Sequence, residues 1–177
     1  IQTVARENAQ WISEFYVIMY SLTSYVDKDL SKKEQVQWMA NEARKRLPET
    51  SYVAKMYDFV KSNYDQGVPW EQARNNVYTR YQVNQEDDYT ITSKNIFCNG
   101  CFAGGINFAA SIVSLLYGEG DLKETIKIGA LSGWDSDNPT ATWGGLLGFM
   151  YGKKGVEDTF GRKFSEKFNI HRTRVNF

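Results

Sequence analysis

The run from Gly133 to Gly148 constrains the fold more than any other part of this chain. It places two carboxylates, Asp135 and Asp137, one residue apart on a short turn that begins with a glycine. The helix expected directly after the turn is too apolar and too rich in glycine to face water. We therefore expect the turn to be buried, where an unpaired carboxylate is costly. Because the run contains no arginine or lysine, a hard cation such as Mg²⁺ is the favoured partner.

Apolar side chains recur at helical spacing through most of the remaining chain, and strand signals are sparse. Capping signals support this pattern. Ser31 with Glu34 has the spacing of a capping box, Thr50 or Ser51 can begin the next helix, and Asp121 can begin another. The sequence therefore predicts an all-α fold, with helices over about 4–25, 31–47, 51–66, 70–81, 99–117, 122–131 and 140–151, and a terminal helix from about 153.

Two of these helices have unusual compositions. Residues 99–117 are almost uncharged and rich in glycine, alanine and serine, which is typical of a helix buried on all sides. In the helix after the acidic turn, Gly144, Gly148 and Gly152 recur every four residues and form a flat face that another helix or a ligand can approach. Asn138 and Pro139 fit an N-cap followed by proline at the first helical position.

The last 25 residues combine charged side chains with Phe160, Phe164 and Phe168 at four-residue spacing. This pattern predicts a terminal helix that docks through an aromatic stripe. Beyond it, residues 170–177 alternate in polarity and fit either a short strand or an extended tail.

The charge balance excludes some classes of partner. The chain has 21 lysines and arginines against 21 aspartates and glutamates, so its formal net charge is zero. This balance argues against broad electrostatic capture of nucleic acid or of an anionic membrane surface. No apolar run reaches the roughly 18–20 residues that span a bilayer. We expect neither nucleic acid nor a membrane as a partner, and the sequence predicts no compartment.

Two other groups of polar residues are weaker candidates for a site. Cys98 and Cys101 have the Cys-x-x-Cys spacing of a redox pair or half a zinc site, but no second cysteine pair exists and His171 lies 70 residues away. We interpret them as two core thiols. The three adjacent acids at 86–88 fit either a cation patch or, as we expect, a solvated loop.

The acidic turn itself has three interpretations. Asp137 or Asn138 can cap the following helix, which explains one acid but not two. A calcium loop also begins with Asp-x-Asp, but its sixth position here is Thr140 instead of glycine and its twelfth is Leu146 instead of glutamate. The third interpretation is a Mg²⁺ or Mn²⁺ site completed by carboxylates from elsewhere, with Asn138 as a possible third ligand.

Residues 133–137 and 140–148 resemble the C-terminal metal motif of the ADP-ribosylglycohydrolase family, which includes the glycohydrolase that reactivates dinitrogenase reductase. That motif is a Gly-x-Asp-Thr/Ser-Asp turn that runs into a helix of small residues. The preceding stretch 115–129, the segment 47–51 and Trp70 with the helix after it are similar as well. The resemblance spans about residues 10–155 and is most specific at the acidic turn.

The resemblance implies an all-α fold, a centre of two Mg²⁺ ions, with Mn²⁺ as a possible substitute, and hydrolysis of the bond between ADP-ribose and an acceptor. It implies metal ligation by Asp135, Asp137 and Asn138, where the family usually has threonine or serine at the last position. Substrate contacts are expected from the other residues of the turn and from one polar side chain on the buried helix, namely Gly133, Trp134, Ser136 and Asn107.

The family also carries an N-terminal half with a Gly-Asp motif and a Thr/Ser-Asp-Asp motif, and residues 1–177 match neither. Asp87 and Asp88 are the nearest acidic pair, in a different context and order. We therefore interpret residues 1–177 as the C-terminal half of a single domain. Its expected partners are the N-terminal half, which is also expected to supply the catalytic acid or base, and an ADP-ribosylated substrate. The alternative is a non-catalytic relative with an ADP-ribose-binding or a structural, crystallin-like role.

Overall fold

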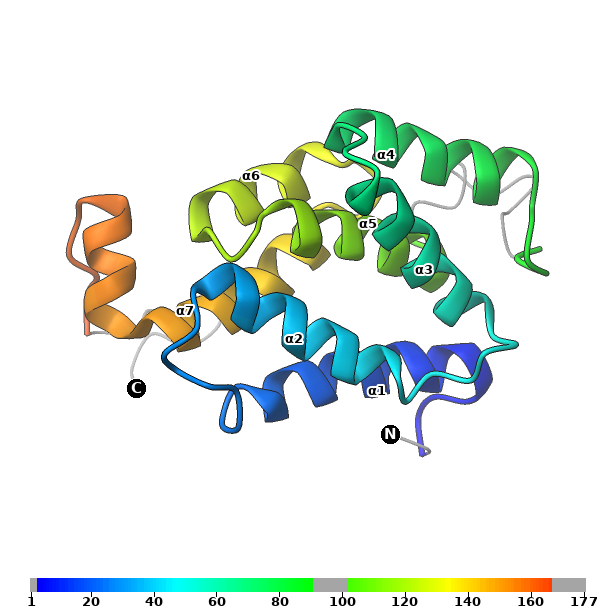
Figure 1. The fold of residues 1–177 in the computed structure, drawn as a ribbon. Coiled ribbons are helices and arrows are strands. Elements are labelled where there is room, and N and C mark those ends of the chain that lie inside the picture. The colour runs from blue at the N-terminus through cyan, green and yellow to red at the C-terminus, as the bar shows by residue number, and fades with distance from the viewer. Residues whose placement is uncertain (1–2, 91–101, 167–177) are drawn as a thin grey trace, which may run out of the picture.

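The computed structural model describes residues 3–90 and 102–166, and every regular element within these ranges is helical (Figure 1). This confirms the predicted all-α fold class. The elements are α1 (Glu7–Leu22), α2 (Lys32–Arg44), α3 (Tyr52–Asp65), α4 (Trp70–Val77), η1 (Tyr78–Val83), α5 (Gly104–Tyr117), α6 (Leu122–Leu131) and α7 (Asp137–Phe160). None of the helices in the described part of the chain has the length and apolarity needed to cross a membrane.

Helix α5 is the centre of the fold, and all the other helices contact it. Its residues from Gly105 to Leu116 are all buried, as its uncharged composition predicts. In Figure 1, α1 and α2 lie together below α5, whereas α3 and α4 cover it on the other side. The apolar side chains of the neighbouring helices form one continuous core around it.

The three predicted caps are confirmed, with Ser51 as the residue that begins α3. The Ser31 hydroxyl accepts a hydrogen bond from the Glu34 N–H, and the Glu34 carboxylate accepts one from the Ser31 N–H. The side chains of Ser51 and Asp121 accept from the backbone N–H groups three residues on, at 3.1 and 2.7 Å. Such caps satisfy N–H groups that have no partner within the helix.

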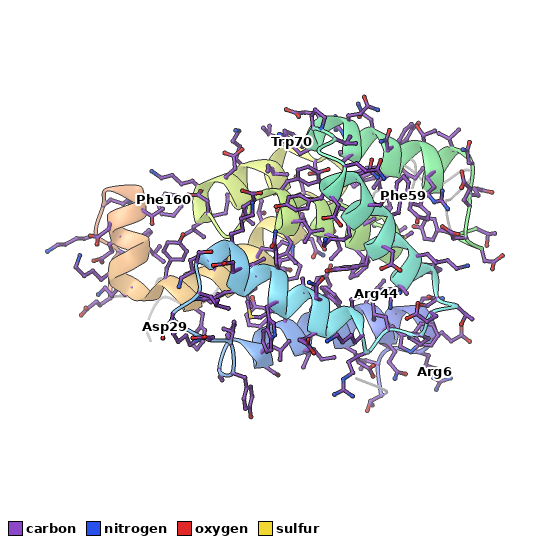
Figure 2. All side chains as sticks on the ribbon, viewed as in Figure 1. Arg6, Asp29, Arg44, Phe59, Trp70 and Phe160 are labelled. Atoms are coloured by element: carbon purple, nitrogen blue, oxygen red, sulfur yellow. The ribbon has the colours of Figure 1, made fainter. Side chains whose placement is uncertain are left out.

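An arginine links the end of α2 to α3 (Figure 2). The Arg44 guanidinium donates to both Glu49 carboxylate oxygens, at 3.1 and 2.7 Å, and to both Asp58 oxygens, at 2.8 and 2.6 Å. The planar fork of arginine suits this paired geometry. This cluster fixes the α2–α3 connection on the side of the molecule away from α7.

The segment predicted as one α-helix over 70–81 contains a change of helix type. The α-helical part ends at Val77, and Tyr78–Val83 forms a π-helix. A π-helix has a wider turn and shifts the direction of the side chains that follow it. Periodicity alone gave no sign of this change.

Helix α7 begins earlier than predicted. Its first residue is Asp137 and its N-cap position is Ser136, whose side chain makes no capping hydrogen bond. The prediction of Asn138 as N-cap was therefore wrong. The backbone explains the shift, because the Asn138 N–H already donates to the carbonyl oxygen of Asp135, at 3.0 Å.

The close approach predicted at the glycine face of this helix is not found. A β-carbon at Gly144 would lie 3.6 Å from Ile126 on α6, an ordinary contact, and one at Gly148 would lie 3.9 Å from Val156. Gly152 has a different role, because its φ of 68° and ψ of 168° break the helix and turn its last part aside. The part of α7 beyond Gly152 lies at the left of Figure 1, where Val156 packs against the core and Lys123 Nζ lies 5.8 Å from the centre of the Phe160 ring.

The predicted aromatic terminal helix was wrong for the residues that follow Phe160. The helix ends there, and Gly161 adopts a left-handed conformation with a φ of 64°. Phe160 and Phe164 are about 40% exposed and do not form a docked stripe. Cys98, Cys101, Phe168, His171 and the alternating segment 170–177 lie outside the described residues.

Candidate functional site

The acidic turn connects α6 to α7 and has an unusual backbone. Gly133 and Trp134 both have positive φ, at 89° and 53°, a conformation that suits glycine and is uncommon for tryptophan. The turn lies at the surface, contrary to the expectation that it is buried: Asp135 is half-buried and Asp137 is exposed. Both carboxylates are therefore accessible to water, and burial alone does not require a cation beside them.

Two side chains from other elements hold the turn in place. The Asn107 side-chain oxygen, on buried α5, accepts a hydrogen bond from the Asp135 N–H, at 3.1 Å. The Gln82 side-chain oxygen, at the end of the π-helix, accepts one from Trp134 Nε1, at 2.5 Å. The backbone at the start of the acidic turn is thereby tied to α5 and to η1.

The first turns of α7 are fixed by a second set of contacts. Trp143 is fully buried and its Nε1 donates to the Ser111 carbonyl oxygen on α5, at 2.7 Å. The hydroxyls of Tyr16 and Ser111 are hydrogen-bonded at 2.9 Å, and burial raises the pKa of Tyr16 to about 12, so its hydroxyl stays neutral. Tyr20, also on α1, donates to the Thr142 carbonyl oxygen at 2.6 Å.

The two aspartates face the same region. The pKa of Asp135 is raised, first because a hydrogen bond with Asp137 favours its protonated form, then because of burial and the negative charge of Asp137. Among the described residues, no lysine, arginine or histidine forms an ion pair with either carboxylate, and no backbone N–H is bonded to them. Neither acid acts as a helix cap.

This donor set fits part of a magnesium site. Two carboxylates within reach of each other, with the nearby side-chain oxygens of Ser136 and Asn138, are ligands that hard cations prefer. In the ranges that the structure describes, no third aspartate, glutamate, histidine or cysteine completes the group. A complete octahedral site therefore needs further ligands, from water, substrate or another polypeptide segment.

A hollow lies on each side of the turn. The first, which we name the α1 hollow, has a volume of about 620 Å³ and is lined by Tyr16, Val17, Tyr20, Ser21, Asn138 and Thr142. The second, the α4 hollow, has a volume of about 280 Å³ and is lined by Arg74, Asn75, Tyr78, Ser132, Gly133 and Trp134. Six of the seven residues predicted for the site are consecutive, from Gly133 to Asn138 at the start of α7, and the seventh, Asn107, is linked to them by a hydrogen bond.

The other acidic group, at 86–88, lies in a loop after η1. Arg80 contacts the carboxylates of Glu86 at 2.8 Å and Asp87 at 3.0 Å, and the Tyr81 hydroxyl donates to Asp87 at 3.1 Å. The predicted loop at 86–88 is therefore confirmed, but Glu86 and Asp87 are paired with Arg80, and of the three acids only Asp88 is exposed.

Sequence reasoning missed three residues beside the turn: Arg74, Gln82 and Tyr20. The Arg74 guanidinium donates to the Ser132 carbonyl oxygen, at 3.3 Å. Arg74 and Gln82 come from a helical segment without any motif, so no signal in the sequence connects them with a turn more than 50 residues away. Tyr20 lies in the helix predicted over about 4–25, and nothing in the sequence connects it with the turn.

The sequence of this chain matches a known protein family. The family described as ADP-ribosylglycohydrolase matches residues 2–174, almost the whole chain. Searches of curated proteins and of solved structures gave no match. The fold and the family match together define an all-helical protein of the glycohydrolase type. More narrowly, this chain belongs to the ADP-ribosylglycohydrolase family.

Proposed function

We propose that this chain forms the metal-binding part of a hydrolase that cleaves the glycosidic bond between ADP-ribose and an acceptor, either a protein side chain or a related small molecule. The observation that carries the proposal is the pair Asp135 and Asp137. Their carboxylates lie within hydrogen-bond reach of each other and have no basic partner among the described residues. Membership of the family supports the class of reaction.

The residues of the turn have separate roles in this proposal. Asp135 and Asp137 hold the cation, with the Asn138 side-chain oxygen as a further ligand. Bound Mg²⁺ would supply positive charge that orients ribose hydroxyls and lowers the pKa of a water molecule. Gly133, Trp134 and Ser136 shape the ribose pocket. Asn107 positions the turn by accepting a hydrogen bond from the Asp135 N–H. A contact of Asn107 with the substrate would be a second role.

The chemistry also needs a group that the described residues do not supply. Water attacks the anomeric carbon while its bond to the acceptor breaks, and a nearby carboxylic acid or carboxylate assists the proton transfers. We assign this group to the N-terminal half of the domain, as a separate partner segment. The exposed apolar side chains of Val17 and Tyr20 on α1 and Phe149 on α7 offer a surface for such a partner. The native mass of the purified protein tests whether a second segment accompanies this chain.

Calorimetric titration of Mg²⁺ into the chain tests the metal site directly. We expect a saturable signal that Asp135→Ala or Asp137→Ala abolishes, because each removes one of only two carboxylates. Asp158→Ala is the matched control, since its carboxylate pairs with Lys154 on the distal part of α7. Heat release that is unchanged in the Asp135 and Asp137 variants would contradict the proposal.

Release of ADP-ribose from proteins modified on arginine or serine then tests the reaction, with the complementary half present. The second candidate function is a non-catalytic relative that binds ADP-ribose or has a structural role. The absence of a third ligand group among the described residues and the asparagine at position 138 favour it. Metal binding without any release of ADP-ribose from the reconstituted domain would select this alternative.

A further inference from the structure

The α4 hollow is lined by a positively charged side chain, Arg74, that has no role in the proposed metal site. Arg74 lines this hollow together with the backbone that leads into the acidic turn. Its guanidinium carries five N–H donors and a permanent positive charge. Among the described residues it makes one hydrogen bond, the 3.3 Å contact with the Ser132 carbonyl oxygen.

Two observations indicate that the Arg74 side chain can accommodate an anion. Its Nε is buried and has no hydrogen-bond acceptor. In addition, none of the ion pairs in the described part of the chain includes Arg74, whereas Arg44 and Arg80 each pair with two carboxylates. A buried N–H donor without a partner is costly, and more so on a charged group. A ligand that accepts from Arg74 would remove this cost.

The backbone that lines the hollow also has donors that are free within the described part of the chain. The N–H groups of Gly133 and Trp134 have no acceptor among the described residues. Ser132 has right-handed helical angles and Gly133 has a φ of 89°, the succession in which neighbouring N–H groups can point toward one anion. At Gly133 an added β-carbon would meet nothing within 4 Å, so a ligand can reach this backbone.

The size and walls of the hollow limit the ligand. About 280 Å³ is at the low end for a small-molecule site, and it suits one charged group of a larger ligand. Tyr78 and Trp134 contribute aromatic walls, and the bond from Trp134 to Gln82 fixes the indole. Arginine combined with backbone N–H groups is a frequent recognition mode for phosphate.

We propose that the α4 hollow binds a phosphate group, with Arg74 as its cationic partner. This inference rests on the proposed function for the identity of the ligand: the group is the diphosphate of an ADP-ribosyl substrate whose ribose lies at the acidic turn. Since Gly133 and Trp134 belong to both the hollow and the turn, a diphosphate held here lies next to the carboxylates that hold the metal ion.

The test is a titration of the ¹⁵N-labelled chain with sodium pyrophosphate at constant ionic strength, without Mg²⁺, followed by two-dimensional NMR. We expect saturable shifts of the Arg74 Nε–H signal and of the Gly133 and Trp134 amides. Arg74→Gln is expected to weaken binding by about tenfold or more, and Arg74→Lys by less, because lysine keeps the charge but not the fork. Lys127→Gln, which changes an exposed cation on α6, is the control and keeps the wild-type affinity.

The inference is overturned if Arg74→Gln, with a native amide spectrum, binds pyrophosphate as the wild type does. It is equally overturned if sodium chloride at the same ionic strength causes the same shifts, or if acetate binds as tightly, which would identify a carboxylate site for a protein partner. Asp135→Asn separates this inference from the proposed function, because it removes a proposed metal ligand and does not change the lining of the α4 hollow. We expect this variant to lose the response to Mg²⁺ and to keep pyrophosphate binding. If the wild type binds pyrophosphate but does not respond to Mg²⁺, the phosphate site is supported and the metal site is contradicted.

Discussion

At the scale of single residues, Asn107 determines where the acidic turn lies. It is one of few polar side chains on a helix that is otherwise apolar, and it is only 7% exposed. Its side-chain oxygen is the link between the buried core and the Asp135 backbone. A small displacement of this amide would move both carboxylates, because they follow directly in the chain.

We expect Asn107→Ala to lower the free energy of unfolding by about 1–3 kcal/mol, because it leaves the partly buried Asp135 N–H without an acceptor. Hydrogen exchange at the Asp135 amide is expected to become faster. Ser114→Ala is the matched control on the same helix, since it removes the bond from Ser114 to the Thr125 carbonyl oxygen. Exchange at Asp135 that responds equally to both variants would argue against a local role for Asn107.

The sequence predicts these residues unequally well, for a physical reason. Asp135, Asp137 and their neighbours form a local pattern, so adjacency in the chain is enough to identify them. Asn107 stands out because a polar side chain in a buried helix needs a partner. Arg74 and Gln82 carry no such signal, since an arginine and a glutamine on a helix are ordinarily solvated. Only the packing of α4 and η1 beside the turn reveals them.

At the scale of elements, one glycine allows α5 and α6 to lie close together at their connection. A β-carbon at Gly118 would lie 2.0 Å from the Thr125 hydroxyl oxygen and 2.7 Å from the Thr125 Cα. The second of these atoms belongs to the backbone and cannot turn away. The tight connection between α5 and α6 therefore requires a residue without a side chain at position 118.

We expect Gly118→Ala to destabilise the fold by about 1–3 kcal/mol through this overlap. Gly144→Ala is the contrasting substitution. Its β-carbon would meet only Ile126 at 3.6 Å, an ordinary contact, so higher helix propensity is expected to stabilise the fold by up to about 1 kcal/mol. Urea unfolding of the two variants measures both effects, and a loss of stability in Gly144→Ala would contradict the assigned contact.

Helical content was predictable from periodicity and capping residues, and the bounds of α6 were predicted to the residue. The π-helix was not, because its sequence also satisfies an α-helical pattern and the choice depends on tertiary contacts. Those contacts include Tyr81, which is buried, and Gln82, which reaches Trp134. The break at Gly152 escaped prediction for a similar reason, since glycine at regular spacing also suits a continuous helix.

At the scale of the whole molecule, Glu119 connects three parts of the fold. Its carboxylate, in the α5–α6 connection, accepts hydrogen bonds from Lys33 on α2 at 2.7 Å and from Tyr64 on α3 at 2.5 Å. These two bonds lower the pKa of Glu119, the one from Lys33 having the larger effect. The folded state therefore favours the ionised carboxylate.

This shift has a definite consequence for stability against pH. The pKa of Glu119 is lower in the folded state than in the unfolded state. The stabilisation of the fold by its ionised carboxylate is therefore fully present above the unfolded pKa, about 4.3, and is lost as the pH falls through the folded pKa. We expect Glu119→Gln to lower the unfolding free energy at pH 7 and to have a smaller effect at pH 3. Chemical unfolding at both pH values measures the difference. An equal effect at both would show that ionisation of Glu119 does not contribute.

The break at Gly152 separates the last part of α7 from the residues assigned to the site. All the side chains assigned to the acidic turn and its two hollows precede it in sequence, and the helical arm beyond it stands apart from them (Figure 1). We therefore expect substitutions or a fused tag on this arm to leave the geometry of the acidic turn unchanged, so that the arm can vary independently of the turn.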